Sequence, residues 1–189
     1  MMKSMKAAIV VVLCGLTSAL PAQADPLSGT RTIVLTNAGG GREVIGQVAF
    51  SPLGDGRSAF KVTLDPRLEE YFLAMRPFRC LTGPTQRLCN FAVEREPQVV
   101  SASDLVPLEY ALMFMRTAPA SLHIDPFNGV YYRMKVVGER IEGSVYDVDM
   151  DPFITPDSVP VERRTRPLRD ADLSAGDPKS HWLPVLHIE

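Results

Sequence analysis

Apolar residues alternate with other residues over two successive runs in the first half of the chain, after a β-branched apolar segment at 32–36. The alternating positions are Val44, Gly46, Val48 and Phe50 in the first run and Phe60, Val62 and Leu64 in the second. Glycine-containing segments at 37–41 and 51–56 separate the runs. A period of two is typical of β-strands, and glycine favours chain reversal, so the pattern predicts an antiparallel meander from Thr32 to Asp65.

At Asp65 the period changes to that of a helix. The apolar residues that would share one helix face are Leu68, Phe72 and Met75. Asp65 is suited to cap a helix that begins at Pro66, and Pro77 would end it. A short helix over residues 66–76 is therefore expected.

A second stretch of helical spacing follows the two later cysteines. Its apolar positions are Leu105, Leu108, Leu112 and Met115. Ser103 or Asp104 would cap this helix, and Pro119 would end the segment. We expect the stripe to pack against a core, although a methionine-rich stripe could also line a ligand pocket.

Two strand-like runs then surround Gly138 and Glu139, from Val130 to Val137 and from Arg140 to about Asp149, and they predict a β-hairpin. Proline and charged residues interrupt the chain after this point, so residues 151–180 read as an extended, partly disordered segment. The apolar residues from Trp182 to Ile188 predict a returning edge strand.

These elements predict a β-rich α+β fold: an antiparallel meander or partly open β-barrel with one or two short covering helices. The expected organisation is a signal peptide over 1–24, a single β-rich globular domain over 25–150, and a C-terminal extension rich in proline and charge over 151–189.

The first 24 residues have the three parts of a secretory signal. Lys3 and Lys6 precede an unbroken apolar run over 7–13, and the small residues before Asp25 end at Ala24. We therefore expect cleavage between Ala24 and Asp25. A retained membrane anchor is the alternative, but the apolar stretch is short for a membrane-spanning helix.

A lipidated cysteine is a second alternative to simple cleavage, because Cys14 lies inside the signal. Leu13 precedes it where a lipoprotein signal needs a small residue, which disfavours lipidation. Without residues 1–24 the chain has 18 basic and 22 acidic residues, a formal charge of −4. This balance disfavours nucleic-acid binding, and no later apolar run approaches the length of a membrane-spanning helix.

Cys80 and Cys89 are the cysteines that remain after cleavage, and Gly83 and Pro84 lie between them where the chain could reverse. A pair close in sequence in an exported protein predicts a disulfide, which would stabilise the fold by about 2–3 kcal/mol. The alternatives are a redox pair or two metal ligands. The spacing is not CxxC and no histidine lies nearby, so neither alternative is favoured.

Three carboxylates, Asp147, Asp149 and Asp151, alternate along the end of the predicted hairpin. Clustered oxygens can bind calcium, but Pro152 stands where a calcium loop has glycine, and Ser158 stands where it has a closing glutamate. We therefore expect a solvated strand end and no metal, with these three residues as the candidate ligands if the prediction is wrong.

Nucleophilic or acid–base catalysis would need a histidine, and His123 two residues before Asp125 is the candidate pair. No G-x-S-x-G, H-E-x-x-H or glycine-rich phosphate loop occurs, so no catalytic residue and no cofactor is predicted. The alternative is that both residues are ordinary polar residues of the loop that precedes the predicted hairpin.

Three phrases of the sequence carry a resemblance: 75–80 (MRPFRC), 125–133 (DPFNGVYYR) and 147–152 (DVDMDP). Together they resemble an uncharacterised family of exported proteobacterial proteins, over roughly residues 42–156. The resemblance implies a periplasmic location and no assigned activity. The meander and hairpin are also similar to small lipocalin-like barrels, but the G-x-W signature is missing and Trp182 is the only tryptophan.

The sequence is compatible with two functions. The first is a non-enzymatic binding or interaction module of the cell envelope, whose apolar interior, around Phe50, Phe60 and Met134, or whose sheet edge receives a lipid, glycan or protein. The alternative is a small periplasmic hydrolase that uses His123 with Asp125 or the carboxylates from Asp147 to Asp151. Whether the protein is an enzyme is left open, with binding preferred.

Overall fold

The computed structural model describes residues 25–73, 76–93, 97–121, 123, 125–150, 153 and 168–189. The predicted signal peptide lies outside the described residues, as do most of residues 151–167. The described strands are β1 (Gly29–Thr36), β2 (Arg42–Gly54), β3 (Arg57–Leu64), β4 (Glu69–Leu73), β5 (Arg76–Thr82), β6 (Arg87–Asn90), β7 (Val99–Ser101), β8 (Phe114–Thr117), β9 (Gly129–Val137), β10 (Arg140–Val148), β11 (Leu173–Ala175) and β12 (Val185–Ile188).

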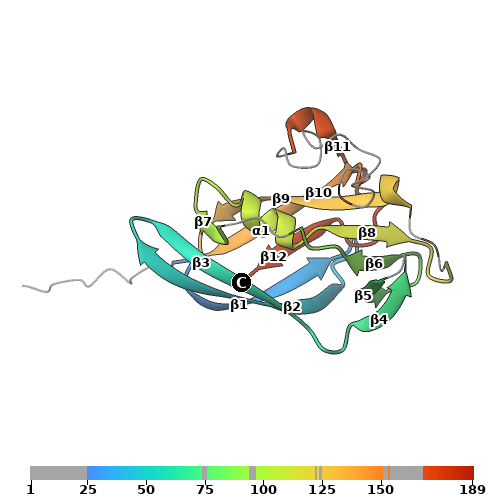
Figure 1. The fold of residues 1–189 in the computed structure, drawn as a ribbon, viewed down its shortest axis with the longest axis horizontal. Coiled ribbons are helices and arrows are strands. Elements are labelled where there is room, and N and C mark those ends of the chain that lie inside the picture. Colours follow the sequence, from blue (N-terminus) through green and yellow to red (C-terminus); the bar gives the residue numbers. More distant parts are fainter. Residues whose placement is uncertain are drawn as a thin grey trace, which may run out of the picture.

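All twelve described strands belong to one antiparallel sheet in the order β4-β5-β6-β8-β9-β10-β12-β1-β2-β3-β7, with β11 paired to β10 beside this path. The sheet curls so that β1–β3 and β8–β10 form two layers, and β4–β6 stand at one end (Figure 1). The helix α1 (Val106–Ala111) packs on β9 and β7. The path ends at β4 and β7, so the sheet is not closed.

The predicted meander and hairpin are confirmed. β1, β2 and β3 pair in sequence order, and β9 and β10 pair along their whole length around Gly138, which adopts a φ of 60° in the turn. Successive β9 residues alternate between the two faces of the sheet, as a period of two requires: Tyr132 packs into one apolar cluster and Tyr131 into the other.

The predicted helix over residues 66–76 is wrong, because this stretch contains β4 and the start of β5. Asp65 does cap the main chain: its carboxylate accepts the N–H of Arg67 at 2.8 Å, but the bond closes a turn that leads into β4. Leu68 is buried whereas Phe72 is 71% exposed, so the predicted stripe does not form one face. Pairing of β4 with β5 outweighs the local helical spacing.

The second predicted helix is confirmed only in its first half. Asp104 accepts the N–H of Val106 at 3.1 Å just before α1, but the N-cap residue is Leu105, so neither predicted residue occupies the cap position. The helix ends at Ala111, and Met115, the last member of the predicted stripe, lies in β8. β8 pairs with both β6 and β9, and this pairing takes the chain out of the helix.

The predicted disulfide is confirmed. Cys80 on β5 and Cys89 on β6 face each other in the ladder and are bonded, with an S–S distance of 2.09 Å. Both residues are fully buried. The reversal between them is closed by a hydrogen bond of 2.9 Å from the Gly83 N–H to the Gln86 carbonyl.

Two apolar clusters lie on opposite faces of the sheet. The inner cluster is enclosed by the curl, and its largest fully buried members are Ile33, Leu35, Ile45, Leu88, Leu108, Leu112, Phe114, Tyr132 and Ile141. The outer cluster lies over the disulfide, and its members are Phe78, Cys80, Cys89, Phe91, Tyr110, Met113, Met115, Tyr131, Val148 and Met150. A one-residue change of register would exchange these two sets, so both clusters fix the pairing.

The predicted edge strand near the end of the chain is also corrected. β12 forms as expected from its apolar residues, but it lies between β10 and β1 and pairs with both. Leu186 and Ile188 are buried in the inner cluster. The segment is short, so its sequence alone does not distinguish an edge from an interior position.

Candidate functional site

The predicted pair of His123 and Asp125 precedes the short helix η1 (Pro126–Asn128), with His123 exposed and Asp125 half-buried. Asp125 accepts the N–H of Phe127 at 3.0 Å and so caps this helix. The carbonyl of His123 accepts hydrogen bonds from Thr117 and Ser121. In the described part of the chain no contact joins the two side chains, so the structure does not bring them together as a catalytic pair.

The three carboxylates that were predicted to alternate, Asp147, Asp149 and Asp151, do not form one described group. Asp147 lies on β10 and contacts Arg116 and His181, Asp149 follows the strand, and Asp151 lies outside the described residues. Among the described residues, no three histidine, cysteine, aspartate or glutamate side chains gather into a possible metal-binding group. The arginine beside Asp147 supplies the positive charge that a metal would otherwise bring.

Sequence reasoning missed the partners of Asp147. The Asp147 cluster consists of Arg116 on β8, Asp147 on β10 and His181, with Arg116 Nη2 3.1 Å and His181 Nε2 3.2 Å from Asp147 Oδ1. His181 Nε2 is buried and makes no aligned hydrogen bond, so its approach to the carboxylate is an electrostatic contact. Gly176 provides the space, since a Cβ there would lie 3.0 Å from Nε2.

Burial lowers the pKa of His181; Asp147 opposes this effect and Arg116 adds to it. The side chain of His181 is only 2% exposed. A substrate could not reach this imidazole without movement of the chain around it. The cluster therefore has the residue types of an acid–base site but lacks an open approach.

A second buried carboxylate was also missed. Glu109 on α1 accepts hydrogen bonds from the Tyr131 hydroxyl and from the Met134 N–H, the latter at 2.5 Å. β9 pairs with β8 only near its start, through Val130 and Gly129. At Met134 the carboxylate thus takes the place of a main-chain acceptor from a neighbouring strand. Burial raises the pKa of Glu109.

The apolar interior is packed with side chains where a ligand wall was expected. Phe50 and Met134 are buried in the inner cluster and contribute to the core. Phe60 differs, because it belongs to the inner cluster and also lines a surface cleft beside β3. The expected binding wall therefore reduces to the region around Phe60.

This β3 cleft has a volume of about 320 Å³. Its lining combines apolar side chains with a few polar ones: Phe60, Lys61, Val62, Leu64, Asn90, Ala92, Gln98 and Ala111. Val62, Leu64 and Ala111 are half-buried. The cleft lies where the sheet path is open, between β3 and the segment that follows β6.

Main-chain groups of β3 face this cleft. β7 pairs with β3 only over Arg57–Ala59, and the Phe60 N–H then donates to the Gln98 carbonyl at 3.1 Å. Main-chain groups of alternate strand residues point to the same side, so those of Val62 and Leu64 follow the direction of Phe60, away from β2. Within the described ranges, no strand occupies this side of β3 beyond Ala59.

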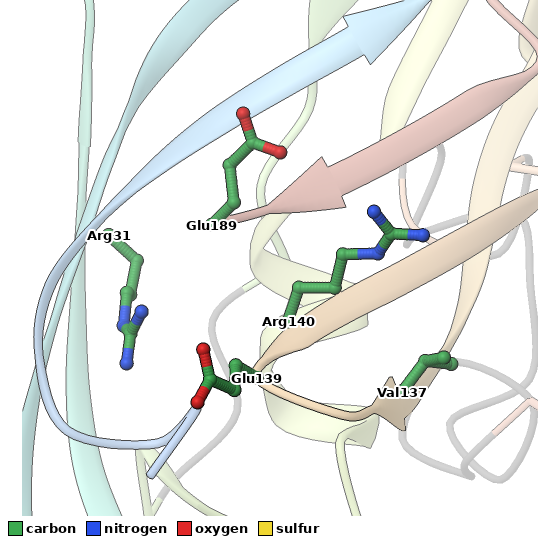
Figure 2. A pocket seen from close by; sticks show the side chains of 5 residues that line it. All are labelled: Arg31, Val137, Glu139, Arg140 and Glu189. Atoms are coloured by element: carbon green, nitrogen blue, oxygen red, sulfur yellow. The ribbon is translucent and has the colours of Figure 1, made fainter. Parts of the chain in front are cut away.

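A second hollow, of about 430 Å³, lies at the turn between β9 and β10. Figure 2 shows Arg31 and Glu139 on neighbouring sides of it, while the side chains of Arg140 and Glu189 extend away from them. Opposite charges balance here. Two arginine and two glutamate side chains line the hollow, so their formal charges cancel and the side chains offer little net charge to a ligand.

Comparison with known proteins finds no matching family model, no similar curated protein and no matching solved structure. The resemblance to exported proteobacterial proteins therefore stays a prediction. The open edge of β3 and its cleft are the described feature best suited to bind another molecule.

Proposed function

We propose that this chain is an exported protein, cleaved between Ala24 and Asp25, that acts in the cell envelope as a non-enzymatic binding module. Its ligand is an extended segment of a partner protein, which lies in the β3 cleft and adds a strand to the open edge of β3. The observation that carries the proposal is the coincidence of main-chain groups at Val62 and Leu64 that point away from β2 with a half-buried apolar cleft.

An extended peptide matches both properties of the cleft. Its main chain can pair with the N–H and C=O groups of β3, each hydrogen bond contributing about 0.5–1.5 kcal/mol net. Its alternate side chains can enter the apolar space beside Val62 and Ala111. A lipid chain would fill the same space but leave the main-chain groups without partners, which disfavours a lipid.

One further observation supports an exported module. The Cys80–Cys89 disulfide is typical of proteins that work in an oxidising compartment. Among the helices of the described ranges, none has the length and apolar character needed to cross a membrane. The hydrolase alternative has no such support, because its candidate histidine and carboxylates do not converge on an open cleft.

Site-specific photo-crosslinking tests the proposal. A photoreactive amino acid is placed at Ala92 in the cleft, and a matched control is placed at Phe127, which is 68% exposed on η1. After expression with export, we expect a peptide adduct from Ala92 and little from Phe127. Val62→Pro should weaken the adduct, because it removes a cleft-facing N–H and leaves the ladder to β2 intact.

Hydrogen exchange supplies a second readout on the unmodified protein. The amides of Val62 and Leu64 should gain protection when the crosslinked partner segment is added as a synthetic peptide. Equal adducts at both positions, a lipid or glycan adduct at Ala92, or unchanged exchange at both amides would each contradict the proposal.

A further inference from the structure

The segment between β11 and β12 forms a loop whose two ends meet at one residue of β10. Ala175 pairs with Tyr146 and Val185 pairs with Ser144, so the nine residues 176–184 stand opposite Val145 alone. Val145 closes both ends of the excursion: its carbonyl accepts the Gly176 N–H at 3.3 Å and its N–H donates to the Pro184 carbonyl at 3.1 Å. We refer to residues 176–184 as the Val145 loop.

Polar contacts dock the Val145 loop against neighbouring elements. Gln86, in the turn between β5 and β6, donates to the Ser180 carbonyl at 2.7 Å and accepts the Trp182 N–H at 3.0 Å. The Tyr132 hydroxyl donates to the Leu183 carbonyl at 2.7 Å. These bonds place the loop across the disulfide hairpin and β9.

Packing completes the docking. The Trp182 ring lies against Gly83, where an added Cβ would be 2.3 Å from ring carbons, and Leu183 is 1% exposed in the inner cluster. A larger residue at position 83 would displace the ring. The loop therefore contributes side chains to the core, although both of its ends are hydrogen-bonded to the same residue of β10.

His181 is the titratable residue that the loop buries. It faces Asp147 from β10 and Arg116 from β8, and Asp177 of the loop itself acts on it at longer range. With a neutral imidazole, the Asp147 cluster has one positive and one negative charge and no net charge. Protonation of His181 would leave one uncompensated positive charge on a buried imidazole beside Arg116, whose own side chain, like that of Asp147, is partly exposed.

We propose that the Val145 loop is an acid-sensitive latch, in which protonation of His181 releases the loop from β10 and exposes Trp182. The released imidazole is hydrated and takes up a proton in its ordinary range, near pH 6.5. The docked imidazole binds a proton less readily because it is buried.

The sign of the pH dependence follows from this difference. The docked state is favoured above about pH 6.5 and loses that advantage as the pH falls below it. One proton is involved, so the opening equilibrium changes by at most about tenfold per pH unit. The latch rests on the loop's own contacts and does not depend on the function proposed for the β3 cleft.

Trp182 allows a direct test, because it is the only tryptophan. Its emission and its quenching by acrylamide are measured between about pH 7.5 and about pH 5 on wild type, on His181→Gln and on the exposed-histidine control His123→Gln. We expect a reversible red shift and stronger quenching on acidification in wild type and in His123→Gln, with far-UV circular dichroism unchanged. His181→Gln should show no such transition.

Hydrogen exchange of the Val145 and Gly176 amides provides a readout on wild type that does not depend on how the variant folds. After correction for the pH dependence of intrinsic exchange, both amides should lose protection on acidification while the amides between β9 and β10 keep theirs. Unchanged protection and emission down to about pH 5, or a full transition in folded His181→Gln, would overturn the proposal.

Discussion

Replacing Glu109 with alanine tests whether a single buried carboxylate stabilises the free edge of β9. In the folded protein this carboxylate accepts the Met134 N–H at 2.5 Å and the Tyr131 hydroxyl. Glu109, Tyr131 and Met134 are 4%, 3% and 8% exposed, so water does not readily replace the lost acceptor.

The expected cost follows from the two donors that lose their partner. A buried donor left without an acceptor costs about 1–3 kcal/mol, so Glu109→Ala should lower the free energy of unfolding by about 2–6 kcal/mol. This is a large fraction of the about 5–15 kcal/mol typical of a folded domain. Glu70→Ala is the matched control, because Glu70 is exposed on β4 and its loss should change stability by less than about 0.5 kcal/mol.

Glu109→Gln separates the hydrogen bonds from the charge. Burial raises the pKa of Glu109 above its ordinary 4.5, so the folded protein binds the proton more tightly than the unfolded chain. That contribution to stability is fully present below the ordinary pKa and is lost as the pH rises through the folded value. Glutamine carries no charge, so Glu109→Gln should gain stability relative to wild type as the pH rises.

Urea unfolding followed by circular dichroism, at several pH values, measures both effects. The reasoning is refuted if Glu109→Ala unfolds at the same urea concentration as the Glu70→Ala control. It is also refuted if the difference between wild type and Glu109→Gln is independent of pH.

Other predictions test the covalent framework and the carboxylate row. Reduction of the Cys80–Cys89 disulfide should lower the free energy of unfolding by about 2–3 kcal/mol, measured by urea unfolding with and without reductant, and unchanged unfolding would contradict it. The intact mass of the exported protein should match a chain that starts at Asp25, and an acyl adduct would contradict this. Millimolar calcium should not raise the melting temperature; a clear rise that Asp149→Ala abolishes would establish a metal site.

Local patterns predicted the parts of the fold that depend on neighbours in sequence. The alternation in β2 and β3, and the reversal between Cys80 and Cys89, each lie within a short segment, and both are confirmed. The helix expected over 66–76 failed because pairing with β5 decides the conformation there. The spacing of Leu68 and Phe72 carries no information on that partner.

The candidate sites depend on contacts between distant segments, which a sequence does not display. Arg116 lies 31 residues before Asp147, so no short motif joins them. His181 reaches the same carboxylate only because the Val145 loop folds back onto β10. Likewise the β3 cleft arises where the sheet does not close. The alternation of Phe60, Val62 and Leu64 predicted the strand that lines one side of the cleft but not the segments that line the other.

The interior position of β12 has a consequence for the order in which the protein can assemble. In the described sheet, backbone pairing joins β1, β2, β3 and β7 to the remaining strands only through β12. The ladders of the two halves are linked only when residues 185–188 take their place between β10 and β1. We therefore expect insertion of this short strand to be the step that joins the two strand groups during folding.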